Sequence, residues 1–189
     1  MIVLASASPR RQELLRNARI AFTVQPADIN ETPLAGESPR ECAERLAREK
    51  ALSVFQGRAG DCVLGADTIV VVDGAILGKP RDADDAVRML GMLSGRTHAV
   101  ITGVCLVWPG AGNAHAWTAS ESTMVTFGEL SDNEIRDYVA TGEPMDKAGG
   151  YAIQGIASRW IPRIEGDYSN VVGLPVALVY RMLRMRGAL

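Results

Sequence analysis

Apolar and polar positions alternate along the first part of the chain in blocks typical of strands and helices. Residues 2–6 are apolar and end in small hydroxyl residues, which predicts a strand that leads directly into a helix over residues 9–18. A second strand is predicted over residues 22–26, followed by a polar loop over residues 28–37. This order of strand, helix and strand indicates an α/β protein.

Capping signals mark where the later helices begin. A capping box runs from Ser38 to Glu41, with proline at the first helical position, and a second runs from Ser131 to Glu134. Asp82 is expected to cap a further helix. The helices predicted after the first cover, in order, residues 39–55, 82–94, 131–141 and 174–186.

The remaining apolar blocks predict strands and a mixed sheet. The β-rich block 62–72 ends at Asp73-Gly74, which is a hairpin turn signal. The other predicted strands cover residues 98–108 and 115–127, on either side of the loop 109–113, and residues 159–164. The hairpins exclude a simple doubly wound arrangement, so we expect a mixed twisted sheet with flanking helices.

Composition narrows the class of protein. The chain has 189 residues, enough for one domain or two small lobes, and is 47% hydrophobic and 22% charged. A net charge of −2 argues against nucleic acid as the main partner. The three cysteines form no C-x-x-C pair, and no signal peptide or span of roughly 20 apolar residues is evident. We therefore expect a cytoplasmic protein with reduced thiols and no membrane partner.

The start of the first predicted helix carries an unusual charge pattern. Ser8 is a suitable N-cap and Pro9 suits the first helical position, yet Arg10 and Arg11 follow at once. Cations in a first turn oppose the helix dipole, whereas an anion there is favoured. Together with Ser6, these residues indicate a phosphate or carboxylate ligand, and the alternative is a solvated arginine pair on an ordinary helix.

Two charged residues interrupt apolar patterns. Lys50 falls on the apolar stripe of the helix predicted over residues 39–55, so it faces inward or along a cleft, unless only its stem is buried. Asp67 interrupts the apolar run 63–72, where a charge is costly unless it is paired, hydrogen-bonded or metal-bound. A carboxylate at a phosphate site can hold Mg²⁺ or accept a proton from water, and the alternative is a structural aspartate.

Lys79 stands between Gly78 and Pro80, where it is either a phosphate counter-charge in a restricted loop or a surface turn lysine. The loop is not a P-loop, because the spacing from Gly74 is one residue short and Pro80 occupies the place of the metal-binding hydroxyl. No dinucleotide-binding G-x-G-x-x-G follows a strand either.

The glycine-rich segment 146–155 allows a ligand to approach the backbone closely, or is simply a connector. Within it, Tyr151 could stack on a base and Gln154 could read a base edge through paired donor and acceptor atoms. His98 and His115 form no metal motif and are expected to be structural.

Taken together, these segments resemble the Maf family of nucleoside triphosphate pyrophosphatases, and the match covers nearly the whole chain. Several ordered motifs carry the resemblance, which is far more specific than any one of them alone. They are Ser6 to Arg11, Leu46 to Lys50, Gly65 to Thr68, Gly78 to Pro80, Leu93 to Gly95, Glu143 to Gly149, Ile153 to Gly155, Gly166 to Tyr168 and Val172 to Pro175.

The resemblance implies a single domain over residues 1–189, with an α/β fold related to inosine triphosphatases and two lobes around a central cleft. It implies a homodimer that hydrolyses a nucleoside triphosphate to the monophosphate and pyrophosphate with a divalent cation. It also implies that Asp67 is the proton acceptor and that Arg11, Thr68 and Gln154 set base preference, in a pattern similar to the dTTP/UTP branch rather than the 7-methyl-GTP branch. The order of small residues at Gly150 and Ala152 departs from the common family order and affects only the loop near the base.

The full hypothesis assigns the triphosphate to Ser6, the helix start with Arg10 and Arg11, Lys50 and Lys79. Mg²⁺ or Mn²⁺ would bridge phosphate oxygens, held by Asp67 and Glu31. Two rival functions remain open at this point. One is a non-enzymatic regulator of septum formation, to which Maf proteins are linked, and the other is a nucleic-acid-binding module that uses local basic patches.

Overall fold

The computed structural model describes residues 1–58, 60–111 and 113–188. Its strands form one seven-stranded sheet in the order β2-β1-β3-β5-β6-β7, with β4 paired to β3. Strand β1 is parallel to β2 and β3, whereas β4 and β7 are antiparallel to their neighbours, so the sheet is mixed as predicted. The strands are β1 (Ile2–Leu4), β2 (Phe22–Val24), β3 (Cys62–Val72), β4 (Ala75–Leu77), β5 (Thr97–Pro109), β6 (Ala114–Thr126) and β7 (Arg163–Glu165).

The helices begin where the capping signals predict. Side chains of Ser8, Ser38, Asp82 and Ser131 each accept a backbone N–H at a helix start, and the capping boxes at Ser38 and Ser131 are both complete. The α-helices are α1 (Pro9–Asn17), α2 (Pro39–Gln56), α3 (Ala83–Leu93), α4 (Asp132–Ala140), α5 (Tyr168–Val172) and α6 (Val176–Arg186). Short 3₁₀-helices cover Glu143–Asp146 (η1), Ala148–Gly150 (η2) and Ile156–Trp160 (η3).

One predicted strand differs from the structure, and the helix α5 was not predicted. The strand predicted over residues 159–164 is wrong at its start, because η3 extends to Trp160 and β7 begins only at Arg163. Ala157 and Trp160 are both buried, and residues three apart share one side of a 3₁₀-helix. Gly112, in the predicted loop 109–113, lies outside the described residues.

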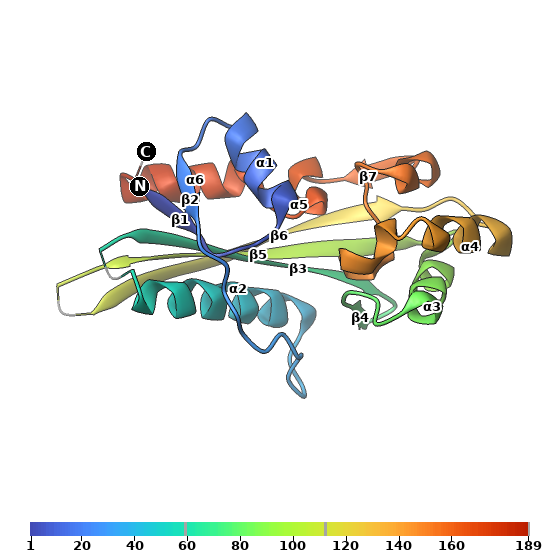
Figure 1. Ribbon diagram of the computed structural model, residues 1–189, viewed down its shortest axis with the longest axis horizontal. Helices are drawn as coiled ribbons and strands as arrows, with labels where there is room; N and C mark the ends of the chain where they lie inside the picture. The colour runs from blue at the N-terminus through green and yellow to red at the C-terminus, as the bar shows by residue number, and fades with distance from the viewer. Residues whose placement is uncertain (59, 112, 189) are drawn as a thin grey trace. The chain divides into compact units, whose positions relative to one another are not determined.

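The chain folds into two compact units, and strands β3, β5 and β6 each contribute residues to both. The first unit comprises Met1–Thr68, Thr102–Glu121 and Gly173–Leu189, and the second comprises Ile69–Ile101 and Ser122–Val172. In the first unit, α2 covers one face of the strands, whereas α1 and α6 cover the other (Figure 1). Across the described part of the chain, every helix is too short or too polar to cross a membrane.

Strand β3 shows how the first unit is built. Leu64 and Ala66 belong to the core shared with α1 and α6, whereas Val63 packs with α2, as the two-residue period of a strand requires. Gly65 lies on the α2 face, where an added Cβ would stand 2.1 Å from the carbonyl oxygen of Ala47. Only glycine therefore lets the backbone of α2 approach β3 this closely.

The second unit contains a buried aromatic cluster around His98. The His98 side chain is 1% exposed, its Nε2 lies 2.8 Å from the Tyr151 hydroxyl, and its ring packs edge-on against Phe127 and Tyr151. This placement agrees with the structural role predicted for His98. Burial lowers the pKa of His98 from its usual 6.5 to about 4, because the charged imidazolium would lose its hydration.

We expect this histidine to make the protein less stable as the pH falls from 6.5 toward 4. In that range the unfolded chain binds a proton at His98 and the folded chain does not, so stability is greatest above the unfolded pKa. The free energy of unfolding should fall by about 1.5 kcal/mol between pH 6.5 and pH 5. Urea unfolding at several pH values measures this slope. His98→Gln should flatten it and the exposed His115→Gln should leave it intact, whereas an equal slope in His98→Gln would contradict the assignment.

Candidate active site

Lys50 and Asp67 meet in the first unit. Lys50 lies on α2 one turn beyond Ala47, so the close packing at Gly65 brings its side chain to β3. Asp67 continues the series of Val63 and Gly65 on the face that α2 covers. The Lys50 Nζ lies 2.6 Å from Asp67 Oδ1, and the two residues are 7% and 6% exposed.

A second carboxylate completes this cluster. Glu31 Oε1 also lies 2.6 Å from Lys50 Nζ, and its side chain is 46% exposed. Two carboxylates from distant parts of the chain therefore converge on one ammonium group. A buried pair of this kind is tolerated because each charge has an opposite charge in hydrogen-bond contact. The prediction that Lys50 faces inward is confirmed, and its whole side chain is buried rather than its stem alone.

Arg11 is the centre of a neighbouring cluster. Its Nε–H donates to the carbonyl oxygen of Gly173 over 2.8 Å, and its two terminal nitrogens donate to Ser6 Oγ over 3.1 Å and to Thr68 Oγ1 over 3.0 Å. Arg11 is 9% exposed, so the alternative of a solvated arginine pair is wrong for this residue, whereas Arg10 is half-buried. Burial lowers the pKa of the Arg11 guanidinium, and the charge of Asp67 opposes that shift.

The two clusters are adjacent because Asp67 and Thr68 are consecutive on β3 and point to opposite faces. Asp67 meets Lys50 on the α2 face, whereas Thr68 meets Arg11 on the face covered by α1. The structure thus places six of the predicted residues in two groups of three, and the residues within each group contact one another through hydrogen bonds or ion pairs. The first group is Glu31, Lys50 and Asp67, and the second is Ser6, Arg11 and Thr68.

Lys79 and Gln154 belong to the second unit, and both are exposed. The Gly149 N–H donates to the carbonyl oxygen of Gly78 over 3.0 Å, which joins the segments that carry these two side chains. An added Cβ on Gly149 would stand 2.9 Å from a methyl group of Val70, so this part of the glycine-rich segment packs closely on β3.

Sequence reasoning missed two members of the Arg11 cluster. Thr102 Oγ1 lies 2.9 Å from Thr68 Oγ1, and Gly173 supplies the carbonyl oxygen that accepts from Arg11. Thr102 stands alone as a polar residue in the apolar run 99–108, which is the same signal that singled out Asp67. Gly173 adopts φ +131°, a backbone conformation that residues other than glycine rarely adopt.

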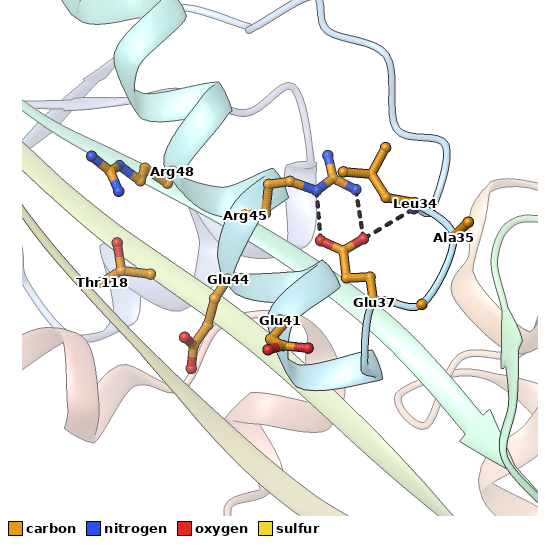
Figure 2. A pocket seen from close by; sticks show the side chains of 9 residues that line it. Leu34, Ala35, Glu37, Glu41, Glu44, Arg45, Arg48 and Thr118 are labelled. Atoms are coloured by element: carbon orange, nitrogen blue, oxygen red, sulfur yellow. Dashed lines mark hydrogen bonds and ion pairs between the residues drawn. The ribbon is translucent and has the colours of Figure 1, made fainter.

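A hollow of about 570 Å³ in the first unit is lined by residues 34–37, by side chains of α2 and by Thr118, none of which is a predicted site residue (Figure 2). Within its lining, Arg45 forms an ion pair with Glu37, in which Arg45 Nε donates to the carboxylate over 2.6 Å. This hydrogen bond lowers the pKa of Glu37 to about 2. Arg45 also donates to the carbonyl oxygen of Thr32 over 3.2 Å, so the contact fixes the segment that follows Glu31.

The Glu31 and Asp67 carboxylates fit a divalent cation. Within the described residues, no group of three or more histidine, cysteine, aspartate or glutamate side chains is arranged to hold a metal. Two carboxylate oxygens nevertheless lie 2.6 Å from a single positive charge, the ammonium group of Lys50. Oxygen donors in this number suit Mg²⁺ or Mn²⁺, which commonly bind through one or two carboxylates together with substrate phosphates and water.

Comparison with known proteins identifies the relatives of this chain. The sequence model of the family described as Maf-like protein matches residues 1–186. The chain belongs to the Maf family. This Maf-family chain is 57% identical over 188 residues to a dTTP/UTP pyrophosphatase of Koribacter versatilis (strain Ellin345), covering 100% of the chain and 95% of the relative. It is 55% identical to a dTTP/UTP pyrophosphatase of Geobacter sp. (strain M21), covering 100% of the chain and 96% of that relative.

Among solved structures, the Maf-family chain is similar to the Ham1 protein of Staphylococcus aureus. The TM-score is 0.50 at 14% identity, and the superposition covers 98% of each chain. At this identity the similarity shows the fold alone. Together with the mixed sheet and flanking helices, it confirms the predicted fold class.

Proposed function

We propose that this Maf-family chain hydrolyses nucleoside triphosphates, dTTP and UTP among them, to the monophosphate and pyrophosphate. The observation that carries the proposal is the contact of Lys50 with both Glu31 and Asp67, beside the Arg11 cluster. An ammonium group held between two carboxylates is a charge arrangement suited to a polyphosphate and its counter-ion. The names of relatives that are 57% and 55% identical over the whole chain support the same reaction.

In this proposal Asp67 orients the attacking water and accepts its proton, while water attacks the α-phosphorus. Lys50 turns from the carboxylates to the phosphates and offsets the charge that develops on the departing pyrophosphate. Asp67 and Glu31 would hold Mg²⁺ or Mn²⁺, which would supply further charge neutralisation and lower the pKa of water. Ser6, Arg10 and the N-terminus of α1 bind phosphate oxygens, as does Lys79.

Base preference is assigned to Arg11, Thr68 and Gln154 on the strength of the family resemblance. The contact between Arg11 and Thr68 supports a shared role, because the guanidinium fixes the threonine hydroxyl that would face the base. Gln154 is exposed and carries a donor and an acceptor, which can pair with the edge of a pyrimidine. A site that hydrogen-bonds its base rejects others strongly, since its own polar groups are otherwise left unpaired.

A nucleotide panel tests the proposed function. The purified protein is incubated with dTTP, UTP, CTP or dGTP, with and without Mg²⁺ or Mn²⁺, and pyrophosphate release is measured. We expect release of pyrophosphate, faster with dTTP and UTP than with dGTP, and dependent on the metal. A folded protein that hydrolyses none of the four nucleotides under any of these conditions would contradict the proposal.

Gln154→Ala is expected to change which nucleotide is preferred more than it changes the maximal rate. Loss of one hydrogen bond to the base should reduce the ratio of kcat/KM for dTTP to that for dGTP by roughly tenfold. The same panel measures this ratio, and Gln56→Ala at the exposed end of α2 is the matched control. Equal loss of rate for all nucleotides would show that Gln154 does not read the base.

The proposal treats residues 1–189 as one pyrophosphatase domain, and the family model covers residues 1–186 of it. Cys42, Cys62 and Cys105 are free thiols, which is consistent with the reducing cytoplasm as the site of action. The homodimer that the resemblance implies is part of the proposal. Sedimentation equilibrium of the full chain tests it directly.

A further inference from the structure

The backbone around Gln154 is attached to two side chains of the second unit. Tyr138, at the end of α4, is 1% exposed and donates its hydroxyl proton to Glu143 Oε1 over 2.8 Å. The same hydroxyl oxygen accepts the N–H of Ala152 over 3.2 Å. Glu143 accepts the N–H of Ile156 over 3.1 Å. The Tyr138–Glu143 pair therefore holds the backbone two residues before Gln154, at Ala152, and two residues after it, at Ile156.

The segment is built to admit this carboxylate. A Cβ added to Gly155 would stand 2.3 Å from Glu143 Oε1, so only glycine leaves room for the carboxylate beside the backbone at that position. The Gly155 N–H also donates to the carbonyl oxygen of Ala152 over 3.0 Å, which closes a tight turn with Gln154 inside it. Gln154 itself is exposed at this turn, so its backbone is fixed while its side chain remains available.

The pair is itself held firmly. The Glu143 N–H donates to Thr141 Oγ1 over 3.2 Å, and the Lys147 ammonium donates to the Glu143 carbonyl oxygen over 2.6 Å. The Tyr138 ring packs edge-on against Trp160, with ring centroids 5.3 Å apart. Burial and the neighbouring Glu143 carboxylate raise the pKa of Tyr138, so its hydroxyl stays protonated and remains a donor.

We propose that Tyr138 and Glu143 are positioning residues that set nucleotide preference by holding the turn that presents Gln154. The inference rests on the proposed function, in which Gln154 reads the base. A hydrogen bond to a base edge is directional and weakens steeply when its geometry changes. A looser turn therefore costs discrimination between bases, whereas the chemical step at Asp67 is left largely as it was.

Tyr138→Phe tests the inference, because it removes the hydroxyl and keeps the ring against Trp160. Equilibrium binding of non-hydrolysable analogues of dTTP and dGTP is measured by calorimetry, together with kcat for dTTP. We expect the ratio of the two dissociation constants to shift by roughly 5- to 10-fold toward dGTP, the loss of about one hydrogen bond. The kcat for dTTP should stay within about twofold of the wild type. Tyr180→Phe, an exposed tyrosine of α6, is the matched control and should change neither quantity.

A double-variant cycle separates positioning from general loosening of the fold. In a Gln154→Ala background, Tyr138→Phe should produce no further change in the ratio, because both variants remove the same contact. Glu143→Gln, which keeps an acceptor oxygen, should give a smaller shift than Tyr138→Phe and provides a second variant should the first not fold.

Three results would overturn the inference in different ways. An unchanged ratio in folded Tyr138→Phe and Glu143→Gln, with a changed ratio in Gln154→Ala, overturns positioning alone. Additive effects in the double variant overturn it as well, since they show that Tyr138 does not act through Gln154. An unchanged ratio in Gln154→Ala overturns base reading by Gln154 and the inference with it. Because binding is measured without turnover, each result is distinct from a failure to hydrolyse nucleotides.

Discussion

Asp67→Asn is expected to lower kcat for dTTP by roughly 10²- to 10⁴-fold, the range typical for loss of a general base. An amide cannot take the proton of the attacking water, yet its oxygen can still accept a hydrogen bond from Lys50 Nζ, now 2.6 Å away. Glu31 remains as the opposite charge for Lys50, so the fold should survive the substitution. Initial rates of pyrophosphate release at saturating dTTP measure the effect, with circular dichroism to confirm folding.

The matched control is Asp73→Asn, which changes an exposed aspartate of the second unit that pairs with Arg96. It should leave kcat within about twofold of the wild type. A metal titration then separates the two roles of Asp67. If Asp67 acts mainly by holding the metal, excess Mg²⁺ or Mn²⁺ should restore part of the rate, whereas loss of a base persists at saturating metal. Ordinary turnover in a folded Asp67→Asn protein would remove Asp67 from both roles.

Local signals in the sequence were sufficient to predict much of the fold and the burial of two charged residues, Lys50 and Asp67. The capping boxes at Ser38 and Ser131 predict helix starts because the hydrogen bonds involved lie within four residues of one another. Lys50 and Asp67 stand out because each breaks an apolar pattern whose period fixes which way the side chain points. Burial of both was therefore predictable.

The partners of these residues were not predictable in the same way. Lys50 meets Asp67 only because the backbone of α2 packs directly against Gly65 of β3. The residues near Lys50 in the sequence carry no signal that predicts this contact. The same holds for Arg11. Its place at a helix start predicts an anionic ligand, whereas in the structure it donates a hydrogen bond to the carbonyl oxygen of Gly173, 162 positions away. Contacts of this separation depend on the tertiary arrangement of elements rather than on the propensity of any one segment.

The 3₁₀-helix η3 was missed for a related reason. Residues 159–164 are apolar enough to predict a strand, yet Trp160 packs against the Tyr138 ring and donates from its indole nitrogen to Glu134 over 3.2 Å. These contacts favour the helical turn at Trp160, and the strand begins only after it. Tertiary packing therefore overrides the strand propensity of this short apolar run.

Lys50→Met is expected to lower the free energy of unfolding by about 3 kcal/mol or more, because it removes one partner of a buried ion pair and leaves the other charge without compensation. Methionine has a similar length, so packing against α2 and β3 is largely kept. The cost arises from the Asp67 carboxylate, which is 6% exposed, and less from Glu31, whose 46% exposed side chain can turn toward water. Urea unfolding at pH 7 measures the change.

A surface pair and a double variant make this expectation specific. Arg58→Met breaks the ion pair with Asp61, in which the Arg58 and Asp61 side chains are 43% and 34% exposed. This substitution should lower the free energy of unfolding by less than about 1 kcal/mol. Adding Asp67→Asn to Lys50→Met should restore part of the lost stability, because the second substitution removes the uncompensated charge that the first creates. If Lys50→Met costs no more than Arg58→Met, or if Asp67→Asn restores nothing, Lys50 is not the counter-charge of Asp67. The site would then need another cation to keep a buried carboxylate ionised, since an isolated buried charge is too costly to persist.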